Sequence, residues 1–243
     1  MKLIIVRHAD PDYSIDSLTE NGWKEAEALK ERFKNIEADA YYVSPLGRAA
    51  DTARKALEGK GIEPVVKDWL REFNCPVKKP RLSYLDDENC VWDWLPADWT
   101  ARPAFYDRDN WMNEPELRTA GVPRKHEAVI SGFDALLSEH GYEREGMNYR
   151  AVNPSHKTIV LFCHFGLECV LLAHLMNISP MILWHSTCSA PSGVTVLNTE
   201  EREKGIVAFR MASFGDISHL YQKGMEPSFH ARFCECYTDD TIH

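Results

Sequence analysis

Three short apolar segments of this chain share one pattern, in which a run of residues typical of a buried β-strand stops at polar side chains. The segments, each with the residues that follow it, are residues 2–6 with Arg7-His8, residues 39–43 with Ser44-Pro45-Leu46-Gly47-Arg48, and residues 158–163 with His164-Phe165-Gly166. In open α/β sheets, ligands bind outside the carboxyl ends of the strands. If the three strands are neighbours, the arginines and histidines that follow them converge on one crevice.

Segments with helix-forming composition alternate with these strands. Thr19 is a plausible N-cap for a helix over residues 20–33. Further helices are predicted over residues 47–57, 126–138 and 166–176, and further strands over residues 63–66, 193–198 and 205–211. The alternation predicts a three-layer α/β fold, with a mainly parallel sheet and helices on both of its faces. We expect one domain over residues 1–243, because this length suits a single α/β domain with an insertion.

The middle of the chain has a different character. Between residues 74 and 124 there is little periodicity, and prolines and aspartates are frequent. A loop of this length inside a compact domain is usually functional or disordered. Four tryptophans argue against disorder, and they are Trp92, Trp94, Trp99 and Trp111. We therefore expect an ordered cap or lid, inserted at about residues 74–125, in which substrate specificity would reside.

The net charge and the cysteines of the chain indicate which binding partners and which cellular compartment to expect. The net charge of −9 repels nucleic acid and anionic membranes, so we expect neither as a partner. The apolar runs are far too short to span a bilayer, and the start of the chain does not have the form of a secretory signal. The seven cysteines are irregularly spaced and contain no CxxC pair, which is typical of reduced thiols in a cytoplasmic protein.

The side chains at the three strand ends favour phosphoryl chemistry. Two histidines and two arginines without a carboxylate among them would make a poor metal site, so we expect no metal and no cofactor. Guanidinium groups bind phosphate oxygens in a bidentate manner and stay charged. They also lower the pKa of a nearby histidine and keep its imidazole neutral. One ring nitrogen could then attack a phosphate dianion while a hydrogen bond, expected to a backbone carbonyl, holds the other.

Five motifs, in order along the chain, resemble those of the histidine phosphatase superfamily, which has the phosphoglycerate mutase-like fold. They are Val6-Arg7-His8-Ala9, Ser17-Leu18-Thr19-Glu20-Asn21-Gly22, Ser44-Pro45-Leu46-Gly47-Arg48-Ala49-Ala50-Asp51-Thr52-Ala53, Cys163-His164-Phe165-Gly166 and Asp216-Ile217-Ser218-His219-Leu220. The first is similar to the Arg-His-Gly signature of that superfamily, and the third to its "SPL.RA..TA" segment. The resemblance covers roughly residues 1–73 and 126–220.

The resemblance implies a role for each site residue. His8 would be the nucleophile, with Arg7, Arg48 and His164 forming the phosphate pocket. Glu72 occupies the position of the proton donor of the family. Three acids of the insertion are the substitutes for that role, and they are Asp86, Asp87 and Glu88.

The chain departs from the family pattern in three places. Ala9 replaces the usual glycine, and Phe165 intervenes between His164 and Gly166. The residues after Glu72 lack the mutase-like "ER.YG" run, which argues against a sugar-phosphate mutase.

The function that these residues favour is hydrolysis of a small phosphomonoester through a phosphohistidine intermediate on His8. One alternative is a phosphoglycerate mutase-like phosphotransferase, which would need a site that excludes water. Another is a catalytically inactive module that binds a phosphorylated ligand on the same fold. Such a module would be expected to lack one of the residues Arg7, His8, Arg48 and His164, and all four are present. The sequence leaves the substrate and the oligomeric state open.

Overall fold

The computed structural model describes residues 1–79 and 90–230, and it contains one large sheet of mixed direction. The order of the eight strands in this sheet is β5-β4-β8-β1-β9-β10-β7-β6. Their bounds are β1 Lys2–Arg7, β4 Ala40–Val43, β5 Val65–Val66, β6 Tyr142–Glu145, β7 Asn148–Ala151, β8 Thr158–Cys163, β9 Val194–Glu203 and β10 Ile206–Asp216. A separate two-stranded ribbon pairs β2 (Pro11–Asp12) with β3 (Ser17–Leu18).

The parallel half of the sheet brings the three predicted strand ends together. Strands β5, β4, β8 and β1 run parallel to one another, whereas β9, β10, β7 and β6 continue the sheet by antiparallel pairing. Arg7 pairs with Cys163, and Val43 pairs with Phe162. The residues that follow β1, β4 and β8 therefore leave the sheet at the same edge.

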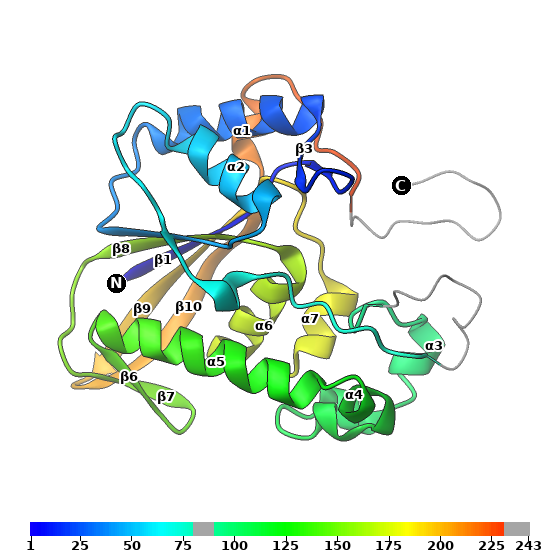
Figure 1. Cartoon of the computed structure of the whole chain (residues 1–243). Helices are drawn as coiled ribbons and strands as arrows, with labels where there is room; N and C mark the ends of the chain where they lie inside the picture. The colour runs from blue at the N-terminus through cyan, green and yellow to red at the C-terminus, as the bar shows by residue number, and fades with distance from the viewer. Residues whose placement is uncertain (80–89, 231–243) are drawn as a thin grey trace.

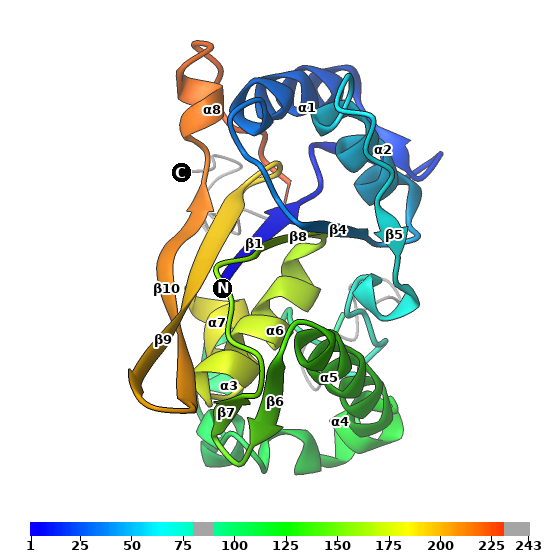
Figure 2. The ribbon, with the colours of Figure 1, turned by 90° about the vertical axis from the view of Figure 1, so that its left-hand side faces the viewer.

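Helices cover both faces of the sheet, which confirms the three-layer α/β prediction (Figures 1 and 2). On one face, Ile4 and Val6 of β1 pack in a buried cluster with side chains of α1 (Glu20–Phe33) and α2 (Gly47–Ala56). On the other face, Leu3 and Ile5 belong to a cluster with α5 (Val122–Glu139), α6 (Phe165–Met176) and α7 (Pro180–Ser186). A parallel strand is buried on both faces, which explains why β1 is apolar throughout rather than alternating.

Two helices begin where the sequence indicates. The side chain of Thr19 accepts a hydrogen bond from the backbone N–H of Gly22, so α1 starts at Glu20 as its N-cap predicts. Helix α6 starts at Phe165, directly after β8, with His164 as its N-cap residue. Helix α8 (Ser218–Tyr221) is the last helix among the described residues and lies against α1.

The described part of the middle segment consists of short helices packed against the rest of the molecule. They are α3 (Pro96–Trp99), the 3-10 helices η2 (Pro103–Tyr106) and η3 (Trp111–Asn113), and α4 (Pro115–Thr119). Trp94, Phe105 and Trp111 are buried in the same cluster as α5 and α6. Asp86, Asp87 and Glu88 lie outside the described residues. Among residues 1–79 and 90–230, no helix combines the length and apolar character needed to cross a membrane.

Candidate active site

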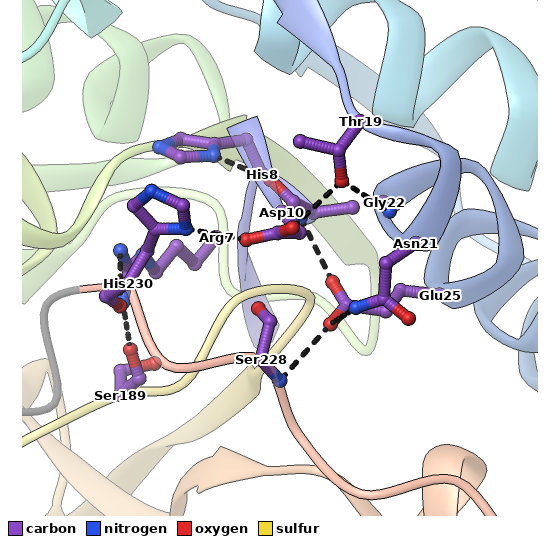
Figure 3. Close-up of polar contacts among 11 residues, drawn as sticks. Arg7, His8, Asp10, Thr19, Asn21, Gly22, Glu25, Ser189, Ser228 and His230 are labelled. Atoms are coloured by element: carbon purple, nitrogen blue, oxygen red, sulfur yellow. Dashed lines mark hydrogen bonds and ion pairs between the residues drawn. The ribbon is translucent and has the colours of Figure 1, made fainter. Parts of the chain in front are cut away.

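His8 is held rigidly at the carboxyl end of β1. Its backbone N–H donates to the carbonyl of Cys163 (2.9 Å), and its carbonyl accepts from the N–H of Ser192 (3.0 Å). The ring Nδ1 lies 2.8 Å from the carbonyl oxygen of Ala9, drawn as a dashed line in Figure 3. Because a carbonyl can only accept, Nδ1 carries the proton and Nε2 of the neutral ring keeps its lone pair. The backbone carbonyl expected from the sequence is thus that of Ala9.

The surroundings of His8 keep its imidazole neutral. The side chain is buried, and burial is the largest cause that holds the pKa of His8 well below its ordinary value. The positive charges of Arg7 and Arg48 lower that pKa further. His8 therefore carries an unprotonated Nε2 at neutral pH.

His164 lies directly beside His8 and is fully buried. The centroids of the two imidazole rings are 5.1 Å apart, at an interplanar angle of 57°. The Nε2 atom of His164 is 2.8 Å from the hydroxyl of Ser44, the residue that follows β4. Burial, then the neighbouring His8, Arg48 and Arg7, hold the pKa of His164 well below its ordinary value. Its Nδ1 atom makes no hydrogen bond within the described residues.

Both arginines are held by hydrogen bonds from the terminal nitrogens of their guanidinium groups. Arg7 donates from Nη1 to the carbonyl of Ser189 and from Nη2 to the carbonyl of His230 (3.2 Å). Arg48 donates from Nη1 to the Oδ1 atom of Asp16 (2.5 Å). Asp16 also accepts the backbone N–H of Gly47 and so caps the start of α2. The Nε atoms of both arginines make no hydrogen bond in the described part of the chain.

Glu72 contacts the N-terminal turn of α6. Its Oε1 atom accepts the backbone N–H groups of Phe73 (2.7 Å) and Leu167 (2.9 Å), and Oε2 lies 3.4 Å from the N–H of Gly166. Burial raises the pKa of this carboxyl, although these hydrogen bonds and both pocket arginines act in the opposite direction. Glu72 is thus a fixed carboxyl whose protonated form is favoured by burial.

Gly166 explains the residue order that departs from the family pattern. A Cβ atom at position 166 would lie 2.6 Å from Nε1 of Trp92 and 2.7 Å from Oε1 of Glu72. Only a residue without a side chain fits there, while the ring of Phe165 lies 5.8 Å from the guanidinium carbon of Arg7. Phe165 can therefore follow His164, because the glycine that leaves room for Glu72 and Trp92 stands at position 166.

One cavity of about 940 Å³ brings the predicted residues together. Arg7, His8, Arg48 and Glu72 line it, and the buried His164 contacts His8 without being a lining residue. The other lining residues are Tyr13, Leu46, Asp68, Trp69, Arg71, Asn74, Cys90, Trp92, Lys125, Ala128, Val129 and Phe165. Within residues 1–79 and 90–230, no group of three or more His, Cys, Asp or Glu side chains is arranged to hold a metal ion.

Residues 3–114 match the family model of the histidine phosphatase superfamily, branch 1. Over this segment, which contains the first three of the five motifs, the chain is similar to that superfamily. The resemblance drawn from those motifs is thereby confirmed.

Several phosphatases are similar to the chain along most of its length. Phosphoserine phosphatase 1 of Hydrogenobacter thermophilus is 22% identical over 216 residues, which cover 85% of this chain and 90% of that protein. The crystal structure of a phosphoserine phosphatase mutant from Entamoeba histolytica, in complex with phosphoserine, matches with a TM-score of 0.58 and 19% identity, over 90% of this chain and 98% of that one. The alpha-ribazole phosphatase of Shigella flexneri matches with a TM-score of 0.55 and 18% identity, over 89% and 97%. These structural matches show that the fold is shared.

Several residues support the site without having been singled out from the sequence. Asp16 holds Arg48, Ser44 holds His164, and the carbonyls of Ser189 and His230 hold Arg7. His230 also lies 2.6 Å from Asp10, and Figure 3 shows its side chain reaching that carboxylate. For Ser44 a signal existed, because it belongs to the "SPL" motif. Ser189 and His230 act through backbone carbonyls, which no residue pattern reveals.

Proposed function

We propose that this chain is a phosphohydrolase that removes the phosphoryl group from a small phosphomonoester through a phosphohistidine intermediate on His8. The observation that carries this proposal is the state of His8. Its Nδ1 is tied to the carbonyl of Ala9, its Nε2 keeps a lone pair, and two guanidinium groups lie close enough to lower its pKa. Such a group is a nucleophile prepared for an anionic electrophile.

In the first step, Nε2 of His8 attacks phosphorus while the bond from phosphorus to the ester oxygen breaks. The charge on the phosphoryl oxygens is stabilised by the guanidinium groups of Arg7 and Arg48, which line the cavity, and by the adjacent His164. The departing alkoxide takes a proton from the carboxyl of Glu72. The Nδ1–H group of the resulting phosphoimidazolium remains bonded to the carbonyl of Ala9.

In the second step, the carboxylate of Glu72 accepts a proton from water as the water oxygen attacks phosphorus. The phosphorus–nitrogen bond breaks, inorganic phosphate leaves and His8 returns to its neutral form. The cycle restores the proton that Glu72 donated in the first step. A carboxyl with a pKa raised by burial suits both roles.

The similarity to phosphatases named for phosphoserine and alpha-ribazole supports a small phosphorylated substrate. We further propose one domain over the whole chain, with a cap inserted at about residues 74–125. The burial of Trp94 and Trp111 among the side chains of α5 and α6 supports this division. The reduced-thiol pattern of the cysteines supports a cytoplasmic location.

The test is to trap the intermediate. Rapid quenching during turnover should leave an acid-labile, base-stable phosphoryl group on His8, and His8→Ala should lose both the label and phosphate release. Label on a serine or aspartate would overturn the mechanism. Transfer of the label to an alcohol in place of water would instead identify a phosphotransferase, and tight binding of phosphate without turnover would identify an inactive binding module.

A further inference from the structure

Beyond the phosphate end, the cavity is lined by two indole rings. Trp69 lies in the 3-10 helix η1 (Asp68–Leu70), and Trp92 lies in the segment before α3. Both line the same cavity as His8 and Glu72, and neither is fully buried. Ala128, Val129 and Leu46 add aliphatic surface to the same cavity. A leaving group that extends from the phosphate into this cavity can therefore meet indole and aliphatic surface.

The ring of Trp69 is fixed by its contact with α5. A Cβ atom at Gly132 would lie 2.5 Å from Cδ1 of Trp69, so the indole packs directly on the helix backbone. The ring centroid of Phe133 is 6.0 Å from that of Trp69. The orientation of this indole is thus set before any ligand binds.

The ring of Trp92 is fixed by contacts close to Glu72. Its Nε1–H donates to the carbonyl of Phe73 (3.2 Å), next to Glu72. Its ring meets the ring of Phe165 edge-on, at 6.2 Å between centroids. The close approach of Nε1 to Gly166 holds it further. A rigid aromatic surface binds a flat group with little loss of side-chain entropy.

The cationic side chains beyond the phosphate end already have protein partners. Nε of Arg71 is 2.8 Å from Oδ1 of Asp68, and Nζ of Lys125 donates to the carbonyls of Glu72 (3.1 Å) and Asn74 (2.6 Å). A second anionic group on the substrate would have to draw Nζ of Lys125 away from these two carbonyls or compete with Asp68 for Arg71. An uncharged ring would leave their contacts unchanged.

We propose that the leaving alcohol of the substrate carries a flat, uncharged aromatic ring close to the ester oxygen, and that Trp69 and Trp92 determine this specificity. The inference rests on the proposed phosphohydrolase function and adds the class of substrate. The cavity of about 940 Å³ has room for such an alcohol beside the phosphoryl group.

The first experiment compares benzyl phosphate, ethyl phosphate and O-phospho-L-serine. All three have alkyl leaving groups that need a proton from Glu72, so the comparison isolates the ring and the charge. Burial of a phenyl ring removes on the order of 100 Å² of apolar surface from water, which corresponds to a gain in kcat/KM of about 50-fold for benzyl over ethyl phosphate. We expect phosphoserine to be no better than ethyl phosphate. A benzyl-to-ethyl ratio near one, or a preference for phosphoserine, would overturn the inference and leave the phosphohydrolase function intact.

The second experiment assigns the preference to the two indoles. Trp69→Leu and Trp92→Leu should each lower the benzyl-to-ethyl ratio at least about fivefold, because leucine offers less planar contact surface. Trp99→Leu is the matched control, since Trp99 stacks on His185 (4.9 Å between centroids) and does not line the cavity. A ratio unchanged in both pocket variants, or lowered equally by Trp99→Leu, would contradict the assignment.

Binding of non-hydrolysable phosphonates separates the two proposals. Calorimetry should give a Kd for benzylphosphonate about 50-fold lower than for ethylphosphonate. If the protein hydrolysed none of the three esters, the phosphohydrolase proposal would fail, and the phosphonate ratio would still decide whether the cavity selects a ring. Equal Kd values would refute the ring preference by themselves.

Discussion

Replacement of Glu72 by glutamine tests the assigned proton donor with little change in shape. The Oε1 atom of Glu72 accepts two short backbone hydrogen bonds, from Phe73 and Leu167, whereas Oε2 has only a 3.4 Å contact with the N–H of Gly166. The amide oxygen of glutamine will therefore take the Oε1 position, and its NH₂ group the Oε2 position. There it resembles the protonated acid but cannot release a proton. The donor–donor contact with Gly166 should cost about 1 kcal/mol of stability.

The kinetic effect of Glu72→Gln depends on the leaving group. A positioned general acid contributes about 10²–10⁴ in rate when an alkoxide must leave. Ethyl and benzyl phosphate should lose activity by that factor. Phosphorylation by p-nitrophenyl phosphate should be affected much less, because p-nitrophenolate leaves without a proton.

The same variant should also alter the second step. Without the carboxylate that activates water, dephosphorylation should slow, and the phosphoenzyme should accumulate with p-nitrophenyl phosphate. Rapid-quench labelling and stopped-flow release of p-nitrophenolate measure the two steps separately. Equal, mild losses with all esters would refute the role of Glu72 and direct the same test to Asp86, Asp87 and Glu88.

Three further predictions concern the charges around the site. Arg48→Ala should lower kcat by about 10³–10⁵ with the fold retained by circular dichroism, while Asp16→Asn should cost less because it keeps the guanidinium; near-normal kinetics of Arg48→Ala would place Arg48 outside the site. Activity should survive prolonged EDTA treatment, because guanidinium and imidazole groups rather than a cation neutralise the phosphoryl charge; loss on chelation that magnesium or zinc restored would contradict this. The pKa of the buried Glu168 is raised from 4.5 to about 7, chiefly by burial, so its contribution to stability is present below pH 4.5 and lost as the pH rises through about 7. In urea titrations, the free energy of unfolding of the wild type should fall by about 3 kcal/mol relative to that of Glu168→Gln between pH 4.5 and about 7. Parallel pH profiles of the two proteins would show that the pKa of Glu168 is not raised.

The sequence predicted the parallel half of the fold because local signals agree there with the tertiary arrangement. β-Branched runs form β1 and β8, and Thr19 caps α1 as expected. The hairpin of β6 and β7 was missed, because its charged, half-exposed strands Tyr142–Glu145 and Asn148–Ala151 carry no apolar alternation. The short helices that begin at Pro96, Pro103 and Pro115 were missed because four or five residues are too few to show a helical period.

The candidate site was predictable where a residue type carries the chemistry, and not where the backbone does. His8, Arg48 and Glu72 could be named because imidazole, guanidinium and carboxyl groups are conspicuous at strand ends and in motifs. The groups that hold His8 and Glu72 in place are backbone groups. Glu72 depends on backbone N–H groups of α6, and His8 depends on the carbonyl of Ala9. Every residue type has these groups, so only the folded arrangement shows which of them are used.

Arg7 shows how far along the chain such support can come from. Its guanidinium donates to the carbonyl of His230, more than 200 residues away in sequence. The imidazole of His230 is in turn 2.6 Å from the carboxylate of Asp10, two residues after the nucleophile, and the N–H of Ser228 lies 3.2 Å from the carboxylate of Glu25. The N–H of Asp10 also donates to Glu25 of α1. The last described segment and α1 therefore both contact Asp10, in the turn after His8. Because the imidazole of His230 binds Asp10 while its backbone carbonyl binds Arg7, His230→Ala should loosen the segment that carries this carbonyl and so disturb Arg7, with the sheet left intact.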